Sequence, residues 1–213
     1  MEAEITEHGG TALAIETDVA NEKSAELMAS ETHKRFGSIN ILMNNAAIYY
    51  DLDPRDGSLD YMRTVLDVNL FSILVCGRAV FPHMKQQGGG SIINISSVGA
   101  YPTQDAFRPQ ENYPNYAYGL SKSGVIFLTQ AMARTGGYAK VRVNAIAPGT
   151  TMTEATKRII PEKAEQRKRL TKALGVSLEP TDLTGTAVFL ASDDSAMMTG
   201  QTLVVDAGGI MLS

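Results

Sequence analysis

The sequence lacks several features that would place it in a specialised class of protein. It has one cysteine in 213 residues, so no disulfide can form within the chain. It has no basic excess, because 19 Lys and Arg residues stand against 23 Asp and Glu residues, which argues against nucleic-acid binding. The longest apolar stretches, near 70–75 and 187–191, are well below the roughly 18 residues that span a bilayer. With no secretory leader at Met1, we expect a cytoplasmic protein without nucleic-acid or membrane partners.

The chain also lacks internal repeats, low-complexity tracts and a linker that would divide it. Apolar residues make up 44%, which is enough for one substantial core, so we expect a single domain over residues 1–213. The lone cysteine, Cys76, lies among apolar residues of a predicted helix. We interpret it as a small core residue rather than a nucleophile, and we expect no metal site.

Predicted strands and helices alternate along the chain. Helical periodicity covers 21–35, 58–85, 115–135 and 183–191, and short apolar runs predict strands at 11–16, 39–43, 91–95, 141–146 and 202–205. Such alternation predicts βαβ units and therefore a doubly wound, Rossmann-like α/β fold with a parallel sheet. Residues 1–8 resemble the end of a helix, so we expect the chain to begin inside the fold.

Tyr118 and Lys122 are the main candidates for chemistry. They lie one helical turn apart, so they share a face of the helix. An ammonium next to a phenol lowers its pKa from about 10, which makes the tyrosine a proton donor closer to neutral pH. The alternative is a solvent-exposed surface pair. Tyr113 and Tyr116 are competing tyrosines, but neither is followed four residues later by a lysine.

Polar residues stand at two further positions where a ligand or a structural role would explain them. Ser96 and Ser97 follow a predicted strand at the end where open α/β sheets bind ligands, and the alternative is that they only form a turn. Asn69 lies in a mostly apolar helix. Because a buried amide without a partner costs about 1–3 kcal/mol, we expect a hydrogen bond that bends the helix or a bound water at Asn69.

Five motifs occur in an order that resembles the short-chain dehydrogenases/reductases. They are Asn44-Asn45-Ala46-Ala47, Asn69, Ser96-Ser97, Tyr118 with Lys122, and Pro148-Gly149. The resemblance covers essentially the whole chain and includes Asp18-Val19 and the segment 200–209. It implies an NAD(P)-dependent oxidoreductase that interconverts a secondary alcohol and a ketone. A 3-oxoacyl thioester is one candidate substrate, and the choice between NAD and NADP stays open.

The resemblance implies a catalytic tetrad of Asn69, Ser97, Tyr118 and Lys122. Tyr118 would be the general acid/base, and Ser97 would polarise the substrate oxygen. Lys122 would lower the pKa of the tyrosine and hold the nicotinamide ribose, while Asn69 would fix a proton-relaying water. These roles agree with what each residue type supplies, namely a tuned proton donor and a donor to developing oxyanion charge.

The resemblance also implies the residues that bind the dinucleotide. Asp18 and Val19 would contact the adenine. The adenosine ribose would lie near Asn45, Ala46 and Ala47, and the nicotinamide and phosphates near Pro148, Gly149, Thr151 and Thr153. The alternative is that the paired asparagines only end a strand and that Pro148-Gly149 only makes a turn.

The chain departs from the family in its glycines. The glycine-rich phosphate-binding turn after the first strand is not found: Gly9-Gly10 and the glycines at 88–90 precede predicted strands, and Gly136-Gly137 ends a predicted helix. We therefore expect the first βαβ unit to be missing and the strand at 11–16 to stand alone or to pair elsewhere. Either the sequence is an incomplete reading of a longer gene, or the chain is catalytically impaired. The alternative function is a non-catalytic dinucleotide-binding or structural remnant.

Two loops bear on the substrate. Ser97 and Tyr118 are 21 positions apart, more than the family usually has, which leaves Ser96 as a second candidate serine. The intervening aromatic loop would wall a substrate pocket or decorate the surface, and Tyr49 and Tyr50 would line the same pocket. The segment 157–172 resembles the family's substrate lid and carries seven basic and two acidic residues, which would attract an acidic substrate or form a solvated helix face.

The resemblance implies a homodimer or homotetramer. Its subunits would meet through the helix that carries Tyr118 and the long helix beside it.

Overall fold

The computed structural model describes residues 2–48, 58–101, 116–160, 162, 166 and 169–211. Its helices are α1 (Glu2–Glu7), α2 (Glu22–Phe36), α3 (Leu59–Leu66), α4 (Ser72–Gln86), α5 (Ala117–Gly136), α6 (Glu154–Ile159) and α8 (Thr184–Ala191). Its strands are β1 (Ile41–Asn44), β2 (Gly90–Ile95), β3 (Val141–Pro148) and β4 (Thr202–Val205). A π-helical turn η1 (Asp67–Phe71) and the 3-10 turns η2 (Val98–Ala100), η4 (Gly137–Ala139), η5 (Pro180–Leu183) and η6 (Asp193–Ser195) complete the description.

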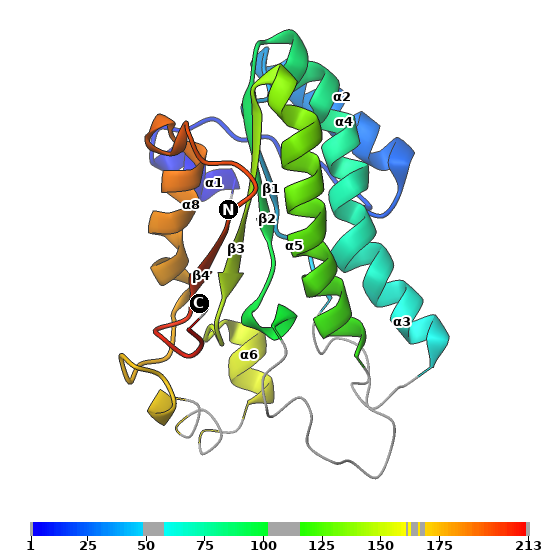
Figure 1. The fold of residues 1–213 in the computed structure, drawn as a ribbon. Helices are drawn as coiled ribbons and strands as arrows, with labels where there is room; N and C mark the ends of the chain where they lie inside the picture. The colour runs from blue at the N-terminus through cyan, green and yellow to red at the C-terminus, as the bar shows by residue number, and fades with distance from the viewer. Residues whose placement is uncertain are drawn as a thin grey trace.

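The strands form one parallel sheet in the order β1-β2-β3-β4, with helices on both faces (Figure 1). Ile92 of β2 packs with residues of α2, α4 and α5. The next residue, Ile93, packs on the opposite face with Leu190 of α8. Since successive side chains of a strand point to opposite faces, this pair shows that both faces are buried, as expected for a parallel sheet. The doubly wound α/β prediction is confirmed.

The long helix predicted to begin after Ser58 is continuous from Leu59 to Gln86, through α3, η1 and α4. Ser58 caps it, since its hydroxyl accepts a hydrogen bond of 3.2 Å from the Tyr61 amide. These 28 residues are long and apolar enough to cross a membrane, judged by length and composition alone. Their contacts with α2, α5 and the sheet place the helix in the layer that covers one face of the sheet. Cys76, on this helix, is buried, and burial raises the pKa of its thiol.

One predicted strand is absent. The segment 11–16 has no regular secondary structure and pairs with no strand, so the prediction of a strand there was wrong. The physical reason is that a strand needs a neighbour to bond to. Within the described residues the sheet begins at β1, whose Ile41 and Met43 side chains are 49% and 46% exposed. The other predicted strands and helices are present, with ends shifted by a few residues.

Candidate active site

The tyrosine and lysine lie on the first turns of α5, at the carboxyl end of the sheet. In Figure 1 the start of α5, the turn after β2 and helix α6 after β3 all lie at the same end of the molecule. The Lys122 ammonium nitrogen donates a 2.8 Å hydrogen bond to the carbonyl of Ile95, the last residue of β2. It also lies 5.8 Å from the centre of the Tyr118 ring. Strand β2 and helix α5 therefore hold this cation beside the phenol.

Lys122 is buried, with 3% of its surface exposed. Burial disfavours the charged ammonium and lowers its pKa to about 8. A surface pair would show neither the burial nor the shift, so the alternative of a solvent-exposed Tyr118–Lys122 pair does not hold for the lysine. Below about pH 8 the site keeps a positive charge close to the tyrosine ring.

The two serines after β2 have different surroundings. Ser96 is 2% exposed, and its hydroxyl donates a 2.9 Å hydrogen bond to the Lys122 carbonyl, which ties the end of β2 to α5. Ser97 is half-buried, and its hydroxyl accepts a 3.0 Å bond from the Gly99 amide. A methyl group built on Gly99 would lie 3.4 Å from the Ser97 hydroxyl and 3.5 Å from a Tyr118 ring carbon. The Ser97 hydroxyl and the tyrosine ring thus border the same small space, whereas the Ser96 hydroxyl is used inside the fold.

Asn69 lies in the π-helical turn and is 1% exposed. Its side-chain oxygen accepts a 2.7 Å bond from the Ile48 amide, and its nitrogen donates a 3.0 Å bond to the Ile48 carbonyl. The amide thus pairs with Ile48 as a neighbouring strand would, and it pins the segment after β1 to the long helix. A π-turn inside an α-helix often marks a functional site. The helix is distorted at Asn69, as expected. The side-chain oxygen and nitrogen of Asn69 both bond to protein atoms, so neither needs a water.

Ser121 is a linking residue that the sequence reasoning missed. It is fully buried, its hydroxyl donates a 2.7 Å bond to the Tyr118 carbonyl, and it lies 3.5 Å from the Asn69 side-chain nitrogen. Ser121 therefore joins the π-turn to the first turn of α5. It stands one residue before Lys122, but only the packing of the two helices shows what it touches.

The residues assigned to the cofactor fall into two groups in the structure. Asn45, Ala46 and Ala47 are exposed directly after β1, and Pro148 ends β3. Gly149 lies so close to the end of β4 that an added Cβ would be 2.8 Å from the Asp206 side chain.

Asp18 and Val19 lie instead at the start of α2. The Asp18 carboxylate accepts a 3.0 Å bond from the Ala20 amide, and the Val19 carbonyl lies 4.0 Å from the Cys76 sulfur. No contact described joins this pair to the tyrosine and lysine.

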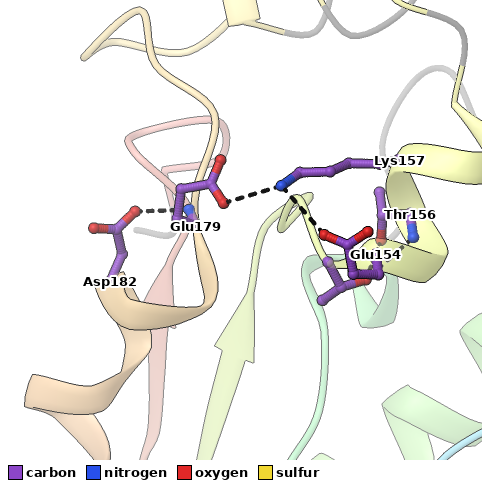
Figure 2. A network of polar contacts seen from close by, with 6 residues as sticks. Glu154, Thr156, Lys157, Glu179 and Asp182 are labelled. Atoms are coloured by element: carbon purple, nitrogen blue, oxygen red, sulfur yellow. Dashed lines mark hydrogen bonds and ion pairs between the residues drawn. The ribbon is translucent and has the colours of Figure 1, made fainter.

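After Gly149 the chain leaves the sheet, and its backbone is bonded to a segment that lies later in the sequence. Thr151 forms a parallel bridge with Leu178, and the Met152 amide donates a 2.7 Å bond to the Leu178 carbonyl. Thr153 caps α6 through a 3.1 Å bond from the Thr156 amide. Lys157 lies 3.7 Å from Glu154 and 3.8 Å from Glu179, so its charge is balanced by two carboxylates (Figure 2).

Thr151 thus bridges two backbone segments and Thr153 caps a helix, so their contacts with the cofactor remain predictions. Tyr49, Tyr50, most of the loop between Ser97 and Tyr118, and part of the basic segment lie outside the described residues.

Known proteins resemble this chain over almost its whole length. Residues 2–209 match the family model described as Enoyl-(Acyl carrier protein) reductase. An uncharacterized oxidoreductase of Mycobacterium tuberculosis (strain H37Rv) is 42% identical over 207 residues, which cover 95% of this chain and 78% of the relative. A 3-oxoacyl-[acyl-carrier-protein] reductase of Synechocystis is 35% identical over 210 residues, 98% of this chain and 80% of the relative.

A solved structure agrees with the fold. The 7α-hydroxysteroid dehydrogenase in complex with NADH and 7-oxo glycochenodeoxycholic acid matches with a TM-score of 0.87 and 31% identity. The match covers 98% of this chain and 78% of that one.

Proposed function

The chain belongs to the short-chain dehydrogenase/reductase family, and from that premise we propose that Ser97, Tyr118 and Lys122 are its catalytic residues and that Asn69, the fourth member of the tetrad, positions them. The protein is an NAD(P)-dependent oxidoreductase that interconverts an alcohol and a ketone. The observation that carries the assignment of residues is the buried Lys122 ammonium beside the Tyr118 ring, with the Ser97 hydroxyl facing the same space. That arrangement offers a proton donor and a hydrogen-bond donor to one substrate oxygen.

The nicotinamide ring supplies the hydride when the cofactor is bound. In the direction of ketone reduction, the Tyr118 phenol donates its proton to the carbonyl oxygen as negative charge develops there. Ser97 donates a hydrogen bond to the same oxygen and so orients it. The Lys122 ammonium stabilises the phenolate that remains, because an opposite charge close by favours the ionised form. Asn69 does not touch the substrate in this scheme. Its side chain bonds to Ile48 and Ser121, and so holds the segment after β1 and helix α5 in fixed positions.

The test compares two tyrosines. Tyr118→Phe removes the phenolic proton and should lower kcat/KM by roughly 10² to 10⁴. Tyr116→Phe is the matched control, because it removes the same atom from the residue before α5 and should leave activity near wild type. The assay is NADH or NADPH oxidation with a panel of ketones that includes a 3-oxoacyl thioester and a 7-oxo steroid. Activity that survives in Tyr118→Phe would refute the assignment.

The residues of this chain suit the two riboses of the cofactor better than its phosphates. The buried Lys122 suits the nicotinamide ribose and the exposed segment after β1 suits the adenosine ribose, whereas the sequence contains no Gly-x-x-x-Gly-x-Gly motif. The proposal is therefore that these residues hold the catalytic half of the site without the phosphate-binding turn. A fluorescence titration with NADH tests it, using this chain and a version extended at Met1 by a glycine-rich βαβ unit.

Binding by the extended version alone supports the proposal. Equal binding by both would mean that the phosphates bind elsewhere on this chain. Binding by neither would favour the non-catalytic remnant.

Assembly through α4 and α5 is the remaining part of the proposal. Exposed apolar side chains here are Leu120 and Phe127 of α5 and Tyr138 of the following turn η4, which are 51%, 69% and 71% exposed. A cavity of about 430 Å³ lies between the two helices and is lined by apolar residues such as Leu74 and Met132. Apolar area of this kind favours a second copy of the chain. Light scattering should show a dimer or tetramer that Phe127→Glu converts to a monomer, and a wild-type monomer would overturn the assignment.

A further inference from the structure

Two of the three histidines meet at the ends of two helices, away from the tyrosine and lysine. Helices α2 and α4 lie side by side on one face of the sheet (Figure 1), with Ala29, Val80 and Met84 buried in the cluster they share. One turn after Ala29, the ring of His33 stacks on the ring of His83. Their centroids are 4.6 Å apart and their planes are inclined by 32°. This pair of imidazoles therefore closes one end of the contact between α2 and α4.

The pair has features that favour a cation. Both histidines stand in the last turn of their helix, where the unpaired carbonyls give the helix end a partial negative charge. The Nδ1 atom of His33 is buried and has no hydrogen-bond partner within the described residues. Buried polar atoms are almost always satisfied by protein, water or an ion, so this nitrogen indicates a missing partner.

The ring spacing suits two ligands of one metal ion. Imidazole is a common ligand of borderline cations such as Zn²⁺, with a Zn–N distance of about 2.0–2.1 Å. Two imidazoles on adjacent coordination positions of one zinc ion have ring centres on the order of 5 Å apart. The 4.6 Å separation of the two ring centres is close to this spacing.

We propose that His33 and His83 form a two-histidine site for a divalent transition cation of the zinc class. Within the described residues no group of three or more His, Cys, Asp or Glu side chains converges, so water completes the coordination. Such a site binds more weakly than a four-ligand structural zinc centre. Its effect would be to fasten the C-terminal end of α2 to α4. The sequence alone had suggested no metal site.

Direct metal titration tests the proposal, using tag-free protein, Zn²⁺ and a chromophoric chelator as competitor. The wild type should bind one equivalent, and His33→Ala and His83→Ala should each weaken binding at least about tenfold. His8→Ala is the matched control, because His8 is exposed after α1 and its ring bonds to the Glu4 carbonyl at 2.8 Å. That variant should bind as the wild type does.

Thermal unfolding supplies a second readout. Zn²⁺ should raise Tm for the wild type and for His8→Ala, and EDTA should reverse the rise, because an ion that binds only the folded state stabilises it. A His33→Gln variant keeps polarity and volume at the site and should show no rise. The proposal is overturned if wild type binds no zinc, or if binding persists unchanged in both alanine variants, which would place the ion elsewhere.

Discussion

Replacing Lys122 by methionine should change how the stability of the protein depends on pH. Burial lowers the pKa of this lysine from 10.5 to about 8, so the unfolded chain holds the proton more tightly than the folded protein does. The cost of charging Lys122 in the fold is fully present below about pH 8. It is relieved as the pH rises towards 10.5, which means that this lysine makes wild-type stability increase over that window.

The magnitude follows from the pKa difference. At about 1.4 kcal/mol per pKa unit, the buried charge costs roughly 3 kcal/mol at pH 7 and roughly 1 kcal/mol at about pH 9.5. Methionine keeps the length of the side chain and cannot titrate. It also leaves the Ile95 carbonyl without the Lys122 donor, which costs about 1–3 kcal/mol and offsets part of the gain. The absolute stability at pH 7 will therefore change little, and the slope with pH is the diagnostic quantity.

Urea unfolding at the two pH values measures this slope. The wild type should gain roughly 2 kcal/mol relative to Lys122→Met between pH 7 and about pH 9.5. Lys23→Met, at an exposed position on α2, is the control and should follow the wild type at both values. Wild type and Lys122→Met curves that shift in parallel would refute the account of Lys122 as a buried, destabilising charge. The same variant should have lost its activity with ketones.

Further substitutions separate structure from chemistry at the other positions. Ser97→Ala should lower kcat/KM by about 10² or more with little change in Tm, because its hydroxyl is proposed to meet the substrate. Ser96→Ala should instead cost about 1–2 kcal/mol in unfolding free energy and leave kcat nearly unchanged, and a reversal of this pair would exchange their roles. Asn69→Leu should destabilise by about 2–4 kcal/mol and speed hydrogen exchange in the segment after β1, since two backbone groups lose their partners; unchanged exchange would contradict this. Gly149→Ala forces a Cβ to 2.9 Å from a backbone atom and should destabilise by about 1–3 kcal/mol, whereas Gly137→Ala, with nothing within 4 Å, should be neutral or stabilising.

Local patterns were sufficient for most of the fold. The cap at Ser58, the apolar run that became β2 and the register that selects Tyr118 over Tyr116 are all properties of neighbouring residues. The segment 11–16 has an equally good strand pattern, yet it is not a strand, because pairing depends on what lies beside it. A sequence pattern shows which secondary structure a segment can adopt, and a strand also needs a second strand beside it to pair with.

The separate roles of the residues in the site were harder to predict from the sequence. Ser96 and Ser97 are equivalent by position in sequence, and only the approach of α5 assigns one hydroxyl to the Lys122 carbonyl and leaves the other beside the tyrosine. The π-turn at Asn69 has the same origin, since the amide pairs with a backbone segment 21 residues earlier. Both features arise from tertiary contacts across long sequence separations.

The backbone bridge between Thr151 and Leu178 bears on how this protein can be re-engineered and how it can evolve. The bridge holds Thr151 and Leu178 side by side, so the two ends of the segment between them are already joined. Doubling the length of such a loop costs only about 0.6 kcal/mol in closure entropy. We therefore expect insertions between Thr151 and Leu178 to be tolerated, except near Ala173 and Leu174, whose amides donate hydrogen bonds to the carbonyls of Gly208 and Ala207 after β4.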